Sequence, residues 1–230
     1  MSKSTLIIGN SDGIGAAVAK ALVERRERVV GVSRSESSFV DQNLRHEVCD
    51  VTSRGYTGVL RRLLNEEDGF GACVYCVGIG SGLTLPDMSN EAHVFEVNLV
   101  AMIRTLEVLV PHWLERGNGH FIGLSSLADA ICNVDGPSYS ASKAAFTNYL
   151  LSMALKLRGT GVSVTNIRFG FVDTKMAKAS RKPLMMTTAE AGRHVLKCLE
   201  ERPIQLSVPK LMAVAACCIG LAQSIKVWTS

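Results

Sequence analysis

The chain has 230 residues, of which 47 % are hydrophobic and 20 % are charged, and its formal net charge is +4. This length and composition fit one α/β domain, residues 1–230, that can bury a sizeable core, and no linker-like tract interrupts it. The basic residues are dispersed rather than gathered on one element, which argues against nucleic acid as a partner. Seven cysteines, an odd number, and the lack of an apolar stretch behind a basic start argue for a reducing cytoplasm rather than secretion.

Apolar residues switch in regular alternation between strand-like and helix-like spacing along the chain. After the first strand, Ile14, Val18 and Leu22 lie on the stripe of a helix that faces a core. Strands are expected at 5–9, 28–33, 44–48, 72–77, 120–125, 162–168 and 204–208, and further helices at 54–65, 97–115, 139–158 and 188–201. This alternation predicts an α/β fold of the Rossmann type, with a doubly wound, mostly parallel seven-stranded sheet and helices on both faces.

The first strand leads into a glycine-rich turn, Gly9-Asn-Ser-Asp-Gly13-Ile-Gly15. Ligands of such sheets bind beyond the carboxyl ends of the strands. Glycine lets the backbone approach a pyrophosphate closely, and a helix that begins near Gly13 directs its unpaired N–H groups at the anion. A tight connection without a ligand is the alternative for such a turn alone, but its place after the first strand favours a dinucleotide site. The expected contacts are Gly9, Ser11, Asp12, Gly13, Ile14 and Gly15.

The end of the second strand bears on the choice of dinucleotide. An acidic residue there binds the ribose 2′-OH of NAD, whereas an arginine accommodates the 2′-phosphate of NADP. Ser33 and Arg34 occupy this place, and no carboxylate there repels a phosphate. We therefore expect NADP(H) as the cofactor, with NAD(H) as the alternative.

Two segments that contain cysteines have plain structural explanations. The run Cys73-Val-Tyr-Cys76 looks like a redox or zinc pair, but residues three apart on a strand point to opposite faces, so no metal site is expected. The pair Cys217-Cys218 falls in the apolar run 211–222. That run is too short for a membrane span of about 20 residues and predicts a packed C-terminal helix at about 210–223.

Tyr139 and Lys143 stand four residues apart, and Tyr139 follows Ser126 by thirteen residues. Positions four apart on a helix share one face, so the ammonium of Lys143 can lie beneath the phenol of Tyr139. A nearby positive charge lowers the pKa of a phenol and makes it a usable general acid and base near neutral pH. The pair therefore indicates a proton donor and the group that tunes it, in hydride transfer to or from a nicotinamide.

The order and spacing of these motifs resemble the short-chain dehydrogenase/reductase family over nearly the whole chain. The matching residues are the G-x-x-x-G-x-G turn, Cys49-Asp50-Val51-Thr52, Asn98, Ser126, Tyr139-x-x-x-Lys143 and Gly170-Phe-Val-Asp-Thr174. The resemblance implies that Tyr139 exchanges a proton with the substrate oxygen and that Ser126 orients and polarises the carbonyl. It implies that Lys143 lowers the pKa of Tyr139 and binds the nicotinamide ribose. It also implies that Asn98 holds a water that links Lys143 to solvent.

The resemblance extends the cofactor site to Asp50, beside the adenine, and to Thr174, at the nicotinamide amide. The further contacts that it implies are Val51, Gly78, Tyr139, Lys143 and Val172. Three assignments keep an alternative: Ser125 in place of Ser126, an Asn98 satisfied by backbone groups, and an Asp50 that caps a helix beginning near Ser53. Asp12 lies where NADP-preferring relatives often carry a base, which weakens the preference for NADP.

The chain departs from the family pattern at two places. Tyr75-Cys76-Val77-Gly78 stands where the family has Asn-Asn-Ala-Gly, so the central strands must be supported differently. Phe169 replaces a proline before Gly170, which leaves that turn less constrained.

The resemblance implies that the segment 175–188 covers the site as a lid. It carries Met176, Leu184, Met185 and Met186, and methionine adapts to irregular apolar shapes. We expect a small-molecule carbonyl or alcohol substrate, specifically a lipophilic ketone or aldehyde. The alternative is that these methionines only pack beneath the lid. The C-terminal apolar helix is expected to form part of the pocket or a dimer contact.

The segment 97–110 is apolar almost all round, which indicates a helix buried on several sides. Together with the helix from Tyr139 it resembles the dimer-forming pair of the family, so we expect a homodimer or homotetramer. The expected function is that of an NAD(P)(H)-dependent carbonyl reductase or dehydrogenase in the cytoplasm, with no membrane span. Two other classes stay open: a nicotinamide-binding sensor or scaffold without turnover, and an isomerase or dehydratase that uses the same tyrosine.

Overall fold

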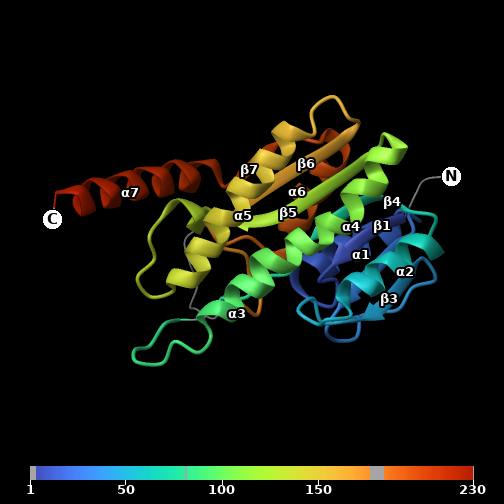
Figure 1. Cartoon of the computed structure of the whole chain (residues 1–230), viewed down its shortest axis with the longest axis horizontal. Coiled ribbons are helices and arrows are strands. Elements are labelled where there is room, and N and C mark those ends of the chain that lie inside the picture. The colour runs from blue at the N-terminus through green and yellow to red at the C-terminus, as the bar shows by residue number, and fades with distance from the viewer. Residues whose placement is uncertain (1–3, 81, 177–183, 230) are drawn as a thin grey trace.

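The computed structural model describes residues 4–80, 82–176 and 184–229. Within these residues seven strands form one parallel sheet in the order β3-β2-β1-β4-β5-β6-β7 (Figure 1). The strands are β1 (Ser4–Ile8), β2 (Val29–Ser33), β3 (Leu44–Val48), β4 (Phe70–Tyr75), β5 (Gly119–Ser126), β6 (Val162–Phe169) and β7 (Gln205–Val208). The predicted Rossmann-type fold is confirmed, and no predicted strand end is wrong by more than two residues.

Helices cover both faces of the sheet. On one face lie α2 (Tyr56–Glu66), α4 (Ala101–Arg116) and α5 (Pro137–Lys156), and on the other lie α1 (Gly13–Glu24) and α6 (Thr188–Glu201). The chain builds from β1 out to β3 and then crosses back to β4, so the direction of winding reverses between β1 and β4. In such folds the ligand crevice opens at this reversal, beyond the carboxyl ends of the strands.

The helix predicted at 97–115 begins earlier and is divided into three parts. A short helix, α3 (Glu91–Phe95), leads into a π-helical turn, η1 (Glu96–Val100), and α4 follows. A π-helical turn accommodates one extra residue in the helix and is common at functional sites. Asn98 lies in this turn and is fully buried.

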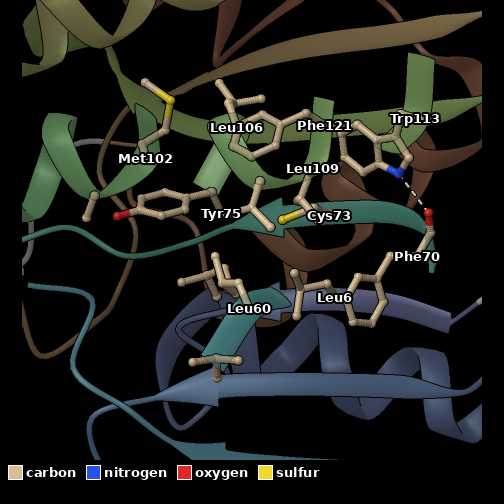
Figure 2. Packing of buried hydrophobic residues seen from close by; sticks show 14 of the residues in the cluster. Leu6, Leu60, Phe70, Cys73, Tyr75, Met102, Leu106, Leu109, Trp113 and Phe121 are labelled. Carbon is tan, nitrogen blue, oxygen red and sulfur yellow. Dashed lines mark hydrogen bonds between the residues drawn. The ribbon is translucent and has the colours of Figure 1, made fainter. Parts of the chain in front are cut away.

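The larger core lies between the sheet and the helices α2, α4 and α5. Figure 2 shows Leu6, Cys73 and Leu109 within it. Trp113 is also fully buried there, and its indole N–H donates to the carbonyl oxygen of Phe70 over 2.7 Å (Figure 2). A Cβ atom on Gly119 would lie 2.1 Å from Cγ of Trp113, so this position admits only glycine beside the indole.

The side chains of Cys73 and Cys76 lie on opposite faces of the sheet. Cys73 lies in the larger core. Cys76, just past the strand, packs against the smaller core, which lies between the sheet and the helices α1 and α6. The predicted opposite orientation is confirmed. Among the described residues no group of three or more His, Cys, Asp or Glu side chains could hold a metal ion.

The C-terminal helix differs from the prediction. Helix α7 (Lys210–Trp228) has 19 residues and continues past residue 223, and Figure 1 shows it extending away from the sheet. Its buried residues are Ala213 and Ala216. The expectation of a packed helix is therefore wrong for most of its surface, because one side alone meets the 3₁₀ turn η2 (Leu127–Ala130). By length and composition alone, α7 is long and apolar enough to cross a membrane.

The segment predicted as a lid is described at its two ends, and residues 177–183 lie outside the described residues. At the far end, the N–H of Asp173 donates to Met186 O over 2.8 Å, and the N–H of Met186 donates to Phe171 O over 2.9 Å. The side chain of Met186 packs against the smaller core. For Met186, this matches the alternative that the methionines pack beneath the segment.

Candidate active site

Four side chains from three elements meet at the carboxyl ends of β4 and β5. Tyr139 and Lys143 come from the first turns of α5, which begins with a proline at 137, a position where proline favours helix initiation. Ser126 ends β5 and Asn98 lies in η1. The structure thus brings together all the residues to which the sequence assigned catalytic roles.

Lys143 is buried beneath this site. Its ammonium donates to the carbonyl oxygen of Leu124 over 2.9 Å and stands 4.9 Å from the ring centre of Phe146. Burial lowers the pKa of Lys143 to about 8 because the charged form loses water, while the nearby carboxylate of Asp129 acts in the opposite direction. The lysine is therefore positively charged at neutral pH, but it can lose its proton more readily than an exposed lysine.

The pKa of Tyr139 is raised rather than lowered. Burial is the largest cause, the carboxylate of Asp129 adds to it, and a hydrogen bond with Ser126 acts the other way. The sequence predicted a lowering by Lys143, but here desolvation of the phenolate outweighs any such effect. A Cβ atom on Gly80 would lie 3.2 Å from Cδ2 of Tyr139, so the backbone at Gly80 closes on one side of the ring.

The geometry distinguishes the two serines at the end of β5. Ser125 is buried, and its hydroxyl lies 2.8 Å from Oγ1 of Thr147, within the polar network under the sheet. Ser126 is half-buried, hydrogen-bonds with Tyr139 and accepts from the N–H of Ala128 over 3.1 Å. Ser126 therefore faces the proposed reaction centre, and Ser125 faces the protein interior.

Asn98 fixes the loop that follows β4. Its Oδ1 accepts from the N–H of Ile79 over 2.7 Å, and its Nδ2 donates to Ile79 O over 2.9 Å and to Ser142 Oγ over 3.0 Å. These contacts match the alternative of an asparagine satisfied largely by backbone. A Cβ atom on Gly78 would lie 3.4 Å from Nζ of Lys143 and 3.6 Å from Oδ1 of Asn98, so the loop passes directly over both groups.

The support of this loop also explains one departure from the family pattern. Tyr75 stands where the family has an asparagine, and its buried hydroxyl donates to the carbonyl oxygen of Val97 over 3.0 Å. Tyr75 thereby ties the end of β4 to the turn that carries Asn98.

The glycine turn has the backbone that a pyrophosphate site requires. Gly9 and Gly13 have φ of 93° and 59°, values that favour glycine. A Cβ atom on Gly15 would lie 2.0 Å from Gly9 O, so the turn closes only with glycine there. Cγ2 of Thr174 lies 3.6 Å from the Cβ position of Gly13. Thr174 thus lies directly beside the glycine turn.

Asp12 caps α1 by accepting from the N–H of Gly13 over 2.7 Å, and its carboxylate lies 2.7 Å from Nζ of Lys175. The hydrogen bond from Lys175 is the largest cause that lowers the pKa of Asp12, followed by the one from Gly13. The carboxylate of Asp12 in the glycine turn is therefore paired. Ile14, the next residue of the turn, packs against the smaller core.

A polar network that the sequence did not reveal supports the end of β2. The hydroxyl of Ser33 donates to Asn10 Oδ1 over 2.9 Å and accepts from the N–H of Ser11 over 3.1 Å. Nδ2 of Asn10 lies 3.1 Å from Nδ1 of His46, whose Nε2 lies 3.1 Å from Ser35 O. Because a carbonyl oxygen only accepts, Nε2 of His46 carries the proton and Nδ1 accepts from Asn10.

Gly31 was the available signal for this network. A glycine inside an apolar strand often marks a close approach, and a Cβ atom here would lie 2.1 Å from Nδ2 of Asn10.

Asp50 lies near Arg34. Oδ1 of Asp50 accepts from the N–H and the hydroxyl of Thr52, over 2.8 Å and 2.7 Å, and these bonds lower its pKa, as does the nearby charge of Arg34. Asp50 does not cap α2, which begins at Tyr56 after Gly55. The predicted contacts Val51 and Val172 are buried at the edges of the two cores.

Beneath the site lies a second network that the sequence analysis missed. Arg168 of β6 donates through Nε to Oδ2 of Asp129 over 2.7 Å, and the hydroxyl of Thr147 donates to the same oxygen over 2.6 Å. Both charged side chains are nearly inaccessible. An arginine within the strand expected at 162–168 was the sequence signal. Asp129 matters for the site because its charge raises the pKa of both Tyr139 and Lys143.

The glycine turn after β1, the reversal of winding at β4 and the residues of the crevice define a Rossmann-type dinucleotide-binding fold. The family model described as short chain dehydrogenase matches residues 3–184. The chain belongs to the short-chain dehydrogenase family of oxidoreductases.

Known relatives and a solved structure agree with this assignment. The chain is 28 % identical to the 3-oxoacyl-acyl-carrier-protein reductase FabG of Vibrio cholerae, with 83 % of each chain covered. It is 31 % identical to an uncharacterized oxidoreductase of Myxococcus xanthus, over 92 % of this chain and 91 % of that one. A short-chain dehydrogenase from Burkholderia cenocepacia, solved in complex with NADP, is 22 % identical with a TM-score of 0.84. The match covers 99 % of this chain and 95 % of that one.

Proposed function

We propose that this enzyme catalyses hydride transfer between NADP(H) and the carbonyl or alcohol group of an apolar small molecule, with Tyr139 as the general acid and base. The observation that carries the proposal is the hydrogen-bonded pair of Ser126 and Tyr139 above a buried Lys143. A sensor that only binds the cofactor has no need of such a proton donor, and this favours an enzyme over a scaffold.

Each residue has a role that follows from its surroundings. The raised pKa of Tyr139 keeps the phenol protonated at neutral pH, which is the form that donates a proton to a carbonyl oxygen. Ser126 shares a hydrogen bond with the phenol, so both hydroxyls can meet one substrate oxygen. Lys143 is held by Leu124 O, leaving further N–H donors for a ribose. The bound nicotinamide supplies or takes up the hydride.

The residues of the crevice fit a dinucleotide. The turn from Gly9 to Gly15 is the phosphate-binding part, and Asp50 and Thr174 stand at the adenine and nicotinamide ends. The pairing of Asp12 with Lys175 reduces the repulsion that this carboxylate exerts on a phosphate. Ser33 and the exposed Arg34 favour a 2′-phosphate, which supports NADP(H) over NAD(H). The NADP held by the Burkholderia cenocepacia protein is consistent with this preference.

Apolar side chains around the crevice support a lipophilic ketone or aldehyde as substrate. Large exposed hydrophobic residues come from the loops that follow β4, β5 and β6, at the edge of the sheet where Tyr139 lies: Leu85, Met88, Val134, Met176 and Leu184. The N–H of Leu83 donates to Asp135 O over 2.8 Å, so the first two loops are neighbours. Cε of Met176 lies 3.7 Å from the Cβ position of Gly78, which brings this side chain to the reaction centre.

We place the enzyme in the cytoplasm, where its seven free thiols would stay reduced. Residues 1–230 would act as one domain, with 175–188 as the lid. The exposed Leu114 of α4 and Leu155 of α5 support a homodimer or homotetramer paired through these helices.

The test is titration of the purified enzyme with NADPH and NADH, followed by absorbance at the reduced-nicotinamide band across apolar and hydrophilic carbonyl compounds. We expect oxidation of NADPH by apolar ketones or aldehydes and its loss in Tyr139→Phe. Cofactor binding without oxidation would favour the sensor reading. Substrate conversion without any change in cofactor absorbance would favour the isomerase or dehydratase. Absence of cofactor binding would reject the proposal.

A further inference from the structure

Helix α7 presents one continuous stripe of exposed side chains, most of them large and apolar. Alternating steps of three and four residues join its members, and the terminal ones, Leu211 and Trp228, are 75 % and 90 % exposed. The members of this outer stripe are Leu211, Val214, Cys218, Leu221, Ile225 and Trp228. A repeat of 3.5 residues is the spacing at which one helix packs along another.

The opposite side of α7 is fixed to the enzyme. Ala213 and Ala216 are buried against η2, and a Cβ atom on Gly220 would lie 1.9 Å from Ala130 O. One turn further on, Oε1 of Gln223 accepts from the N–H of Cys132 over 2.8 Å, and Nε2 donates to Cys132 O over 2.9 Å. At 100° per residue, these contacts turn the outer stripe away from the protein body.

The sides between the two faces are mostly small or polar. Lys210, Cys217 and Ser224 lie along one side, and Ala215 and Ala222 lie along the other. Ile219 and Val227 are the large exposed apolar residues of α7 outside the stripe. Five of the seven large exposed apolar residues of α7 thus lie in one stripe, as for a single partner helix.

We propose that α7 pairs antiparallel with α7 of a second copy of this chain along the outer stripe. In this register Leu211 meets Trp228 of the second copy, Val214 meets Ile225, and Cys218 meets Leu221. A parallel pair would instead align each Lys226 with its own counterpart. The antiparallel pair also covers the exposed end, residues 224–229, which Figure 1 shows extending from the body.

The area is sufficient for a specific contact. Six side chains that each expose on the order of 100 Å² would together cover about 1,200 Å² on two copies, the lower end of the range for stable interfaces. This contact is separate from the one proposed through α4 and α5, and it does not depend on the proposed chemistry.

A bilayer fits the geometry less well. A spanning helix needs about 20 residues within the hydrocarbon, which would pull the docked face from η2 and strip Gln223 of both bonds to Cys132. In the helix as it packs against η2, both polar atoms of the Gln223 side chain are already hydrogen-bonded to Cys132.

The first experiment compares the variant Val214→Glu/Leu221→Glu, which alters the stripe, with Ile219→Glu, a control at an exposed apolar residue of α7 outside the stripe. Light scattering after gel filtration at micromolar concentration gives the mass. We expect the stripe variant to have half the mass of the wild type and the control to be unchanged, whether the wild type is a dimer or a tetramer. Circular dichroism and NADPH binding confirm that each variant is folded. Equal masses for wild type and stripe variant would overturn the proposal.

Oxidative crosslinking tests the register. In a Cys217→Ser background, Leu221→Cys should form a covalent dimer with Cys218 of the second copy, whereas Ala222→Cys should form several-fold less. Crosslinking of the background through Cys218 alone would overturn the antiparallel register. Sedimentation with phosphatidylcholine/phosphatidylglycerol vesicles completes the test. We expect the wild type to remain in the supernatant, and pelleting that is lost in the stripe variant would overturn the proposal in favour of a lipid surface.

Discussion

The ammonium of Lys143 donates to the carbonyl oxygen of Leu124, 2.9 Å away, and the lysine is buried, with 4 % of its surface exposed. This contact holds the lysine under the crevice, and burial lowers its pKa from 10.5 to about 8. The two values define a pH window in which the folded and unfolded chains bind different numbers of protons.

Lys143→Met should change how stability depends on pH. As the pH rises from about 8 to 10.5, the folded wild type releases this proton before the unfolded chain does, so the wild type gains stability relative to the variant. Urea unfolding of both proteins across this window measures the difference. A difference that stays constant from neutral pH to 10.5 would contradict the lowered pKa of Lys143.

Tyr139→Phe should lower kcat by about 10²–10⁴-fold, because the proton donor is lost while the ring is kept. The Kd for NADPH should stay within a few-fold of the wild type. Because the pKa of Tyr139 is raised, carbonyl reduction by the wild type should persist at alkaline pH, and alcohol oxidation should accelerate as the pH rises. A reduction rate that already falls between pH 6 and pH 8 in step with one deprotonation would contradict this assignment.

Arg34→Ser should weaken NADPH binding by roughly 10- to 100-fold, the loss expected for a charged hydrogen bond to phosphate, with little effect on NADH. Fluorescence titration with both cofactors gives the two Kd values. Arg193→Ser, which removes an exposed arginine from α6, is the matched control and should leave both unchanged. Equal weakening for NADPH and NADH would show that Arg34 does not read the 2′-phosphate.

Asn98→Ala should reduce the free energy of unfolding by about 1–3 kcal/mol, because the backbone N–H and C=O of Ile79 lose buried partners. It should also lower kcat, since the loop over Lys143 is released. Chemical denaturation and steady-state kinetics measure the two effects. Full stability in the variant would mean that water replaces the amide without cost.

Gly119→Ala should destabilise the fold by about 1–3 kcal/mol, because the new methyl group overlaps the indole of Trp113. Gly58→Ala in α2 is the matched control: nothing lies within 4 Å of its Cβ position, so the same change should stabilise the protein by about 0.5–1 kcal/mol. Thermal unfolding of both variants should show shifts of opposite sign. Shifts of the same sign would show that either Gly119 does not contact Trp113 or the Cβ position of Gly58 is not open.

Local patterns made the fold predictable from sequence. Short apolar runs predicted the strands. The glycine turn and the spacing of Tyr139 and Lys143 predicted where the cofactor and the substrate would bind. The π-helical turn at Asn98 was not predictable, because the segment 97–110 is apolar almost all round and hides the phase shift that an extra residue causes. Asn10 and His46 meet across 36 residues, and Asp129 and Arg168 across 39, so neither network appears in any local window.

The upward direction of the pKa shift of Tyr139 was not predicted, for a related reason. The spacing to Lys143 suggested the nearby charge, but desolvation depends on the whole surrounding fold.

The docking of α7 on η2 also constrains chain length. The stretch from Leu127 to Cys132 is held at both ends. At its start Ser126 hydrogen-bonds with Tyr139, and at its end Gln223 hydrogen-bonds with the backbone N–H and C=O of Cys132. Surface connections usually tolerate inserted residues at small cost. Here a single inserted residue would have to break either the contact between Ser126 and Tyr139 or the contact between Gln223 and Cys132. Relatives that keep both contacts should therefore keep this stretch at the same length.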